Sequence, residues 1–241
     1  MSNRYRDLFG DRKRLFPVNH VRNLEQALRN TETALAADAD GIFLIGHGMP
    51  YQKLVEIYQG VRSRYPKFWI GLNCLDLPTY EAIEVVAGGL PQQPNGLWSD
   101  DIGIRERPRE SNGYAERCQQ RLDALGFAGC YFGGTAFKYQ VAVASKDLPQ
   151  VAKLATQYAD VVTTSGVGTG HMPEISKIMT MREAIGRHPL AIASGIAIEN
   201  VRLFLPYTDA FLVASSLETE PKSDELDLQR VKALAAVIHG D

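Results

Sequence analysis

Three short segments in the C-terminal part of the sequence combine small residues in a way that suits anion binding. Residues 165–170 read SGVGTG, and apolar runs end in the turns 193–196 (ASGI) and 214–217 (ASSL). Such turns let the backbone approach a bound group, and free N–H groups there and at a helix start bind phosphate. We expect a phosphate site formed by Ser165, Gly166, Gly168, Thr169, Gly170, His171, Ser194, Gly195, Ser215 and Ser216, with Asn19. Taken alone, residues 165–170 are a weak signal for phosphate binding, because they lack the G-x-G-x-x-G pattern. The alternative for this segment is a flexible connection between a strand and a helix.

Two adjacent carboxylates and a lysine supply candidate groups for proton transfer. Asp100 and Asp101 follow the apolar stretch 96–99, and successive strand residues point to opposite sides, so only one of them faces a given site. A facing carboxylate with a pKa raised by burial suits acid–base work, and helix capping or ion pairing is the alternative. Lys138 lies among aromatic residues, which predicts a desolvated amine or a substrate-binding cation, with a surface lysine as the alternative.

Further polar residues follow other apolar runs. His20, His47 and Asn73 each come at or just after the end of such a run. Histidine is the side chain whose ordinary pKa lies nearest neutrality, which suits proton transfer. His47 and Asn73 join Asp100, Asp101 and Lys138 as candidate catalytic residues. No H-x-H or H-E-x-x-H spacing occurs, so we expect a metal-free polar pocket without a cofactor. A metal site at the two histidines with Asp76 or Asp101 is the alternative.

These residues require a scaffold that brings many strand ends together. Short apolar runs alternate with helical periods. The expected strands are 15–19, 41–45, 68–72, 96–99, one within 128–143 with a bulge or hairpin at Gly133-Gly134, 160–164, 190–193 and 210–214. The helices between and after them are expected near 21–35, 51–61, 79–87, 113–125, 148–158, 175–185, from about 198–200, and 226–238. Strict alternation predicts an α/β protein with a parallel sheet, and eight units predict one (β/α)₈ TIM barrel over residues 1–241, with an open doubly wound sheet as the alternative.

Composition narrows the classes of function. The 241 residues carry a formal net charge of −2, which gives no basic excess for nucleic acid. No window approaches the length of a membrane span, and residues 1–16 lack the apolar region of a signal peptide. The odd cysteine count, three, fits a reducing cytoplasmic compartment without disulfides. We expect the basic residues among the first fourteen to form a solvated N-terminal arm; the composition leaves open whether the chain forms a homo-oligomer.

The segment 165–217 resembles the BtpA/SgcQ family of (β/α)₈ proteins, within the ribulose-phosphate-binding barrel group. The matching positions are Ser165, Gly166, Thr169, Gly170, Ser194, Gly195, Glu199, Asn200 and 209–216, with Ala193 and Ala210 in place of family glycines. Lys138 resembles the family's strand-five lysine. In that strand we expect Lys138 to point into the barrel mouth and its aromatic neighbours, Phe137 and Tyr139, to face the helices.

Two classes of function follow from these residues. The first is an enzyme that binds a phosphorylated sugar or phosphoribosyl-type metabolite at the barrel mouth, with Asp/Lys acid–base or carbonyl chemistry. Isomerisation, lyase chemistry and phosphoribosyl transfer all remain open. The second, motivated by the resemblance, is a non-catalytic assembly or regulatory protein that retains a ligand pocket. Convergence of Asn19, His47, Asn73, Asp101 and Lys138 on one pocket would favour the enzyme.

Overall fold

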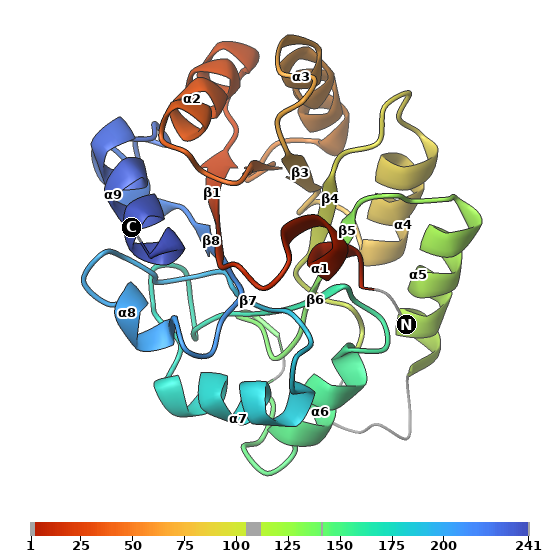
Figure 1. The fold of residues 1–241 in the computed structure, drawn as a ribbon. Coiled ribbons are helices and arrows are strands. Elements are labelled where there is room, and N and C mark those ends of the chain that lie inside the picture. The colour runs from red at the N-terminus through yellow and green to blue at the C-terminus, as the bar shows by residue number, and fades with distance from the viewer. Residues whose placement is uncertain (1–2, 105–111, 141, 241) are drawn as a thin grey trace.

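Eight parallel strands close into a barrel in the computed structural model, which describes residues 3–104, 112–140 and 142–240 (Figure 1). The strands are β1 (Arg14–His20), β2 (Ile42–Ile45), β3 (Ile70–Asn73), β4 (Gly96–Ser99), β5 (Cys130–Gly134), β6 (Val161–Thr164), β7 (Leu190–Ile192) and β8 (Ala210–Val213). Each strand pairs with the next one, and β8 pairs with β1. This topology confirms the predicted α/β class and the (β/α)₈ barrel.

Helices surround the barrel and connect its strands (Figure 1). They are α2 (Leu24–Ala36), α3 (Tyr51–Arg64), α4 (Thr79–Ile83), α5 (Asn112–Ala124), α6 (Leu148–Ala155), α7 (Ile175–Ile185), α8 (Val201–Phe204) and α9 (Leu228–His239). A π-helical segment, η1 (Glu84–Gly88), continues α4, so the single helix predicted over 79–87 changes its hydrogen-bond pattern midway. A short 3₁₀ helix, η2 (Ser215–Leu217), follows β8. None of the described helices is long and apolar enough to cross a membrane.

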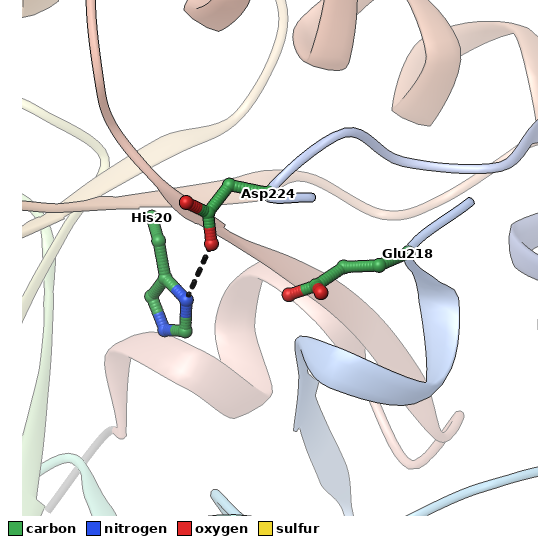
Figure 2. Close-up of side chains that lie close together, drawn as sticks. All are labelled: His20, Glu218 and Asp224. Atoms are coloured by element: carbon green, nitrogen blue, oxygen red, sulfur yellow. Dashed lines mark ion pairs between the residues drawn. The ribbon is translucent and has the colours of Figure 1, made fainter. Parts of the chain in front are cut away.

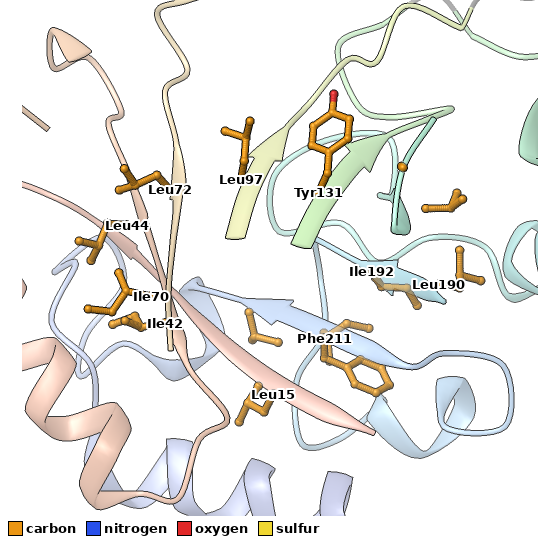
Figure 3. Close-up of a cluster of buried hydrophobic side chains, with 14 of the residues drawn as sticks. Leu15, Ile42, Leu44, Ile70, Leu72, Leu97, Tyr131, Leu190, Ile192 and Phe211 are labelled. Atoms are coloured by element: carbon orange, nitrogen blue, oxygen red, sulfur yellow. The ribbon is translucent and has the colours of Figure 1, made fainter. Parts of the chain in front are cut away.

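Side chains of the strands alternate between two cores. Every second residue points outward and packs beneath the helices, as Ile42, Leu44 and Leu72 do in Figure 3. The residues between them fill the barrel, where Phe43 and its neighbours pack edge to face with other aromatic rings. Gly71 makes room for this, because a Cβ atom there would lie 2.2 Å from the Phe43 ring. Both faces of each strand are therefore apolar, as in other buried parallel sheets.

The N-terminal segment is not the solvated arm that its charges predicted. Residues Arg4–Phe9 form helix α1, which lies across the amino-terminal opening of the barrel in Figure 1. Tyr5 is fully buried, and its hydroxyl donates a 2.9 Å hydrogen bond to the carbonyl of Asp209 just before β8. Arg6 forms an ion pair with the Asp209 carboxylate at 2.7 Å. Arg4 and Arg6 were misread because their partners, Asp160 and Asp209, lie 156 and 203 positions away in the sequence.

The predicted bulge or hairpin at Gly133-Gly134 is also wrong. Gly133 pairs with Ser99 on one side and Val162 on the other, so β5 runs straight through this position. The reason for glycine is close packing, because a Cβ atom on Gly134 would lie 1.9 Å from the carbonyl oxygen of Asp100. Residues 1 and 2 of the N-terminal segment and residue 141 of the strand-five region lie outside the described residues.

Candidate active site

A cavity of about 270 Å³ opens at the carboxyl ends of the strands. Its floor is apolar and consists of the upper inward-facing side chains of the barrel, Val18, Ile45, Trp98 and Leu212. Its walls carry polar residues and small-residue turns from most of the strand ends: His20, His47, Asp100, Lys138, Tyr139, Thr169, Gly170, Ser194, Gly195, Ser215 and Ser216. A concave site with an apolar floor and a few convergent polar groups is typical of small-molecule binding.

Asp100, not Asp101, faces this cavity. It continues the inward alternation of Gly96 and Trp98 along β4, and its Oδ1 accepts a 3.0 Å hydrogen bond from Asn73 Nδ2. Burial raises the pKa of Asp100, although the bond from Asn73 and the charge of Lys138 oppose this effect. The Asp101 carboxylate points elsewhere and accepts a 2.7 Å bond from the backbone N–H of Gly103. Asp100 therefore has the environment of an acid–base group, and Asp101 stabilises a turn.

Lys138 reaches the cavity from the loop after β5, and not from within the strand as the sequence predicted. Its Nζ lies 3.5 Å from the Thr169 hydroxyl and 5.7 Å from the centre of the Phe137 ring. Its backbone N–H donates a 2.7 Å bond to Ser165 Oγ. The strand alternation expected for its neighbours does not apply in the loop: Phe137 is buried inside the barrel, and Tyr139 is 79% exposed at the cavity wall.

The loop after β6 divides into a buried part and an exposed part. Ser165 and Gly166 are buried, and a Cβ atom on Gly166 would lie 2.1 Å from the carbonyl oxygen of His171. Thr169 and Gly170 are exposed and line the cavity. Gly168 lies beside the Tyr139 hydroxyl, outside the cavity wall. Only the exposed part of the predicted phosphate loop is thus placed to contact a ligand.

The His171 side chain points back to its own loop, because His171 Nδ1 lies 3.2 Å from the Thr169 carbonyl. Lys177 on α7, which the sequence did not single out, ties this loop to the one after β5. Its Nζ donates to the carbonyls of Ala136 and Ser165 at 2.6 and 2.7 Å. Burial lowers the pKa of Lys177 to about 8.

Ser194 and Gly195 form a tight turn after β7 that holds the loop after β6. Ser194 Oγ accepts a 2.7 Å bond from the backbone N–H of Gly166 and donates a 3.0 Å bond to the carbonyl of His171. Gly195 has φ +65°, and a Cβ atom there would lie 2.0 Å from Met172 N. Asn200 fixes the turn by donating to the Gly195 carbonyl at 2.8 Å. The Ser194 hydroxyl is therefore already engaged within the protein.

The turn after β8 presents its serines beside this structure. Ser216 Oγ donates a 2.7 Å bond to the carbonyl of Ile196, whereas Ser215 is exposed at the cavity wall. The helix expected from about residue 198 is short and begins at Val201. These turns, and not the start of a long helix, therefore line this side of the cavity.

The strand-end residues of β1 and β2 also separate by side. His20 and His47 line the cavity, with ring centroids 5.8 Å apart. Asn19 points to the opposite side of β1, where its Oδ1 accepts bonds from Gln26 and Asn30 of α2 at 2.7 and 3.0 Å. The Asn19 side chain, which the sequence predicted as a ligand contact, is therefore directed away from the cavity.

Both carboxylates of the alternative metal site, Asp76 and Asp101, are engaged by backbone N–H groups. The Asp76 carboxylate caps α3 by accepting from Tyr51 N at 2.8 Å, and Asp101 is engaged by Gly103. His20 instead lies beside Glu218 and Asp224, two residues that sequence reasoning missed. The three cysteines, Cys74, Cys118 and Cys130, are free and buried.

The closed parallel barrel and the cavity at the carboxyl ends of its strands define a (β/α)₈-barrel protein. The chain belongs to the BtpA family, whose family model matches residues 117–240. This match confirms the resemblance seen in the segment 165–217.

Comparison with individual proteins adds similarity in sequence and in fold. An uncharacterized protein of Pyrococcus abyssi, PYRAB10620, is 32% identical over 81 residues, which are 33% of this chain and 31% of that protein. Phosphoribosyl anthranilate isomerase from Thermus thermophilus has a TM-score of 0.60 at 20% identity, with 92% of this chain and 96% of that chain covered. The (S)-3-O-geranylgeranylglyceryl phosphate synthase from Thermoplasma acidophilum, in complex with sn-glycerol-1-phosphate, has a TM-score of 0.68 at 11% identity, with 99% and 97% covered. At these identities the solved structures establish the shared fold.

Proposed function

We propose that this protein is an enzyme that binds a phosphorylated sugar or a phosphoribosyl-type metabolite in the cavity at the barrel mouth. The observation that carries the proposal is that one cavity combines the Lys138 cation, three small-residue turns and the Asp100 carboxylate. The names of the similar structures support the same substrate class, because phosphoribosyl anthranilate and glyceryl phosphate both carry a phosphate. Fold alone does not define a reaction, so the proposal depends on the residues of the cavity.

The phosphate group would lie against Thr169-Gly170, Gly195 and Ser215-Ser216. Lys138 supplies the positive charge at this end, since its Nζ is directed to Thr169. Ser165, Gly166 and Ser194 hold these turns in place through hydrogen bonds within the protein.

The chemistry would take place at the other end of the ligand, beside Asp100. A carboxylate whose pKa is raised by burial can exchange a proton with a sugar hydroxyl or with a carbon next to a carbonyl. Asn73 orients the carboxylate through its hydrogen bond, and His47 provides a second polar group in the cavity wall. We favour a charged, electrostatic role for Lys138, because its positive charge already acts on the neighbouring Asp100 carboxylate, whose pKa it lowers.

A thermal-shift titration with inorganic phosphate, ribose 5-phosphate and unphosphorylated ribose tests this proposal. A ligand at 100 times its Kd adds about 2.7 kcal/mol to the free energy of unfolding, or roughly 5–11 °C in Tm for a chain of this size. We expect this shift with the phosphorylated compounds and not with ribose. Lys138→Met should remove the shift, whereas Lys153→Met, an exposed lysine on α6, should preserve it.

Turnover is then followed by mass spectrometry on any sugar phosphate that binds. Loss of turnover in Asp100→Asn with binding preserved would support the assigned acid–base role. If no phosphorylated compound stabilises the protein, the proposal fails and the non-catalytic alternative replaces it.

A further inference from the structure

Three side chains from two distant parts of the sequence gather beside the cavity. His20 ends β1, Glu218 follows η2, and Asp224 lies in the loop between Glu218 and α9 (Figure 2). One ligand atom from each residue lies within 4.8 Å of the other two. An imidazole nitrogen and two carboxylates form a common ligand set for divalent transition metals.

The carboxylate of Glu218 contains a buried oxygen atom that has no hydrogen-bond partner among the described residues. Glu218 is only 4% exposed, and among the described residues nothing donates a hydrogen bond to its Oε2 atom. Figure 2 shows its carboxylate directed toward the His20 ring and Asp224. A buried charged group without a partner is costly, and such groups in native proteins usually pair or coordinate a metal. The cluster therefore contains a buried carboxylate oxygen that the protein itself leaves unsatisfied.

Asp224 divides its two oxygens between the protein and the cluster. Its Oδ2 accepts a 2.7 Å bond from Arg22 Nε, whereas Oδ1 lies 3.4 Å from His20 Nδ1. Arg22 is thus a neighbour of the carboxylate on its outer side, where 55% of the arginine side chain is exposed. One oxygen of Asp224 remains directed toward the position between the three residues.

The loop that carries Asp224 is fixed by helix α2. Gln26 and Asn30 both donate to the Asp224 carbonyl, at 2.6 and 2.7 Å, and Leu226 N donates to Asn30 Oδ1 at 2.9 Å. The same two amides bind Asn19, which precedes His20 on β1. This shared network fixes the backbone at both sides of the cluster, as residues around metal ligands generally do.

We propose that His20, Glu218 and Asp224 bind a divalent first-row transition metal ion, such as Zn²⁺ or Mn²⁺, at the edge of the barrel mouth. The two carboxylates balance the charge of the ion. Ligand bonds of about 2.0–2.2 Å place tetrahedral ligand atoms roughly 3.3–3.6 Å apart, so the side chains close by about 1 Å on binding.

Three protein ligands leave coordination positions open, which is the pattern of catalytic metal sites. Because His20 also lines the cavity, a metal ion bound to it would lie next to the space where we place the phosphorylated compound. A bound metal would there contact an oxygen of that ligand or a water molecule. Metal binding itself does not depend on the proposed function.

The test uses the full chain, freed of metal by dialysis against a chelator and titrated calorimetrically with ZnCl₂ and, separately, MnCl₂ without any phosphorylated compound. We expect one ion to bind per chain. Glu218→Gln should weaken the binding by at least about tenfold. Glu220→Gln is the matched control, because this nearby glutamate is exposed and outside the cluster.

Folding is checked by the Tm of each metal-free variant, and Glu218→Gln should match or exceed the wild type because it removes an unpaired buried charge. Failure of both metals to bind the wild type, or equal binding by Glu218→Gln and the wild type, would overturn the proposal. A site that binds metal while no phosphorylated compound binds would refute the proposed function and leave this inference intact.

Discussion

Replacement of Ser194 by alanine distinguishes a structural serine from a ligand contact. Its type and position after β7 predicted phosphate binding, but its hydroxyl joins Gly166 N–H to the His171 carbonyl across the loop after β6. Ser194 is only 8% exposed, so water does not readily replace the lost hydroxyl. Ser194→Ala should therefore destabilise the folded protein itself, with or without ligand.

The two hydrogen bonds set the size of this effect. An unsatisfied buried donor or acceptor costs about 1–3 kcal/mol, and the carbonyl is less demanding than the N–H. We expect the free energy of unfolding to fall by about 2–4 kcal/mol. For a chain of this length, that lowers Tm by roughly 4–16 °C.

Scanning calorimetry and urea unfolding measure the effect, with Ser215→Ala as the matched control. Ser215 is an exposed serine in the neighbouring turn, so its removal should change the free energy of unfolding by less than about 0.5 kcal/mol. Phosphate binding should depend on Ser215 more than on Ser194. A Ser194→Ala variant that keeps its Tm but loses phosphate binding would refute the structural role.

Two further predictions concern charge and packing. Burial raises the pKa of Asp100 above its usual 3.8, so the folded state holds the proton more tightly and the ionised group lowers stability at neutral pH. Asp100→Asn should increase the free energy of unfolding at pH 7, and this gain should shrink as the pH falls through the pKa of Asp100 in the folded state. Urea unfolding at pH 7 and pH 4.5 measures the effect. No gain at either pH would contradict the prediction. Tyr5→Ala should lower the free energy of unfolding by about 3–5 kcal/mol, because it empties the buried position under the barrel. The exposed Leu8 on the same helix is the control, and a small effect at Tyr5 would show that α1 is dispensable.

The sequence predicted the barrel well because its evidence is local and repeated. Eight apolar runs separated by helical periods identify the strands, and the range 96–99 for β4 is reproduced in full. The sequence could not decide between Asp100 and Asp101. In a buried parallel barrel both faces of a strand are apolar, so hydrophobicity does not show which face is inside. In the structure, Trp98 points into the barrel, and Asp100, two residues further along, faces the same side.

Lys138 illustrates a different limit. The aromatic context placed it correctly near the cavity but suggested a strand, because alternating apolar residues look alike in a strand and in a compact loop. The conformation of that loop depends on bonds from Lys177 and Ser165, which lie 27 or more residues away. The residue types around Lys138 thus indicated a cation near the site, whereas the conformation of its loop depends on contacts with residues far away in the sequence.

The same alternation separates a cavity-facing polar residue from a structural one at the end of β1. Asn19 and His20 are adjacent, yet one binds α2 and the other faces the cavity and the buried Glu218. The network on the Asn19 side fixes the loop that carries Asp224, so the structural residue determines where the carboxylates meet the histidine. A sequence search for metal motifs fails here because the ligands are about 200 positions apart and meet only when β8 closes against β1. Barrel closure is therefore the step that creates both the cavity and the proposed metal site, and His20 is the residue that the two have in common.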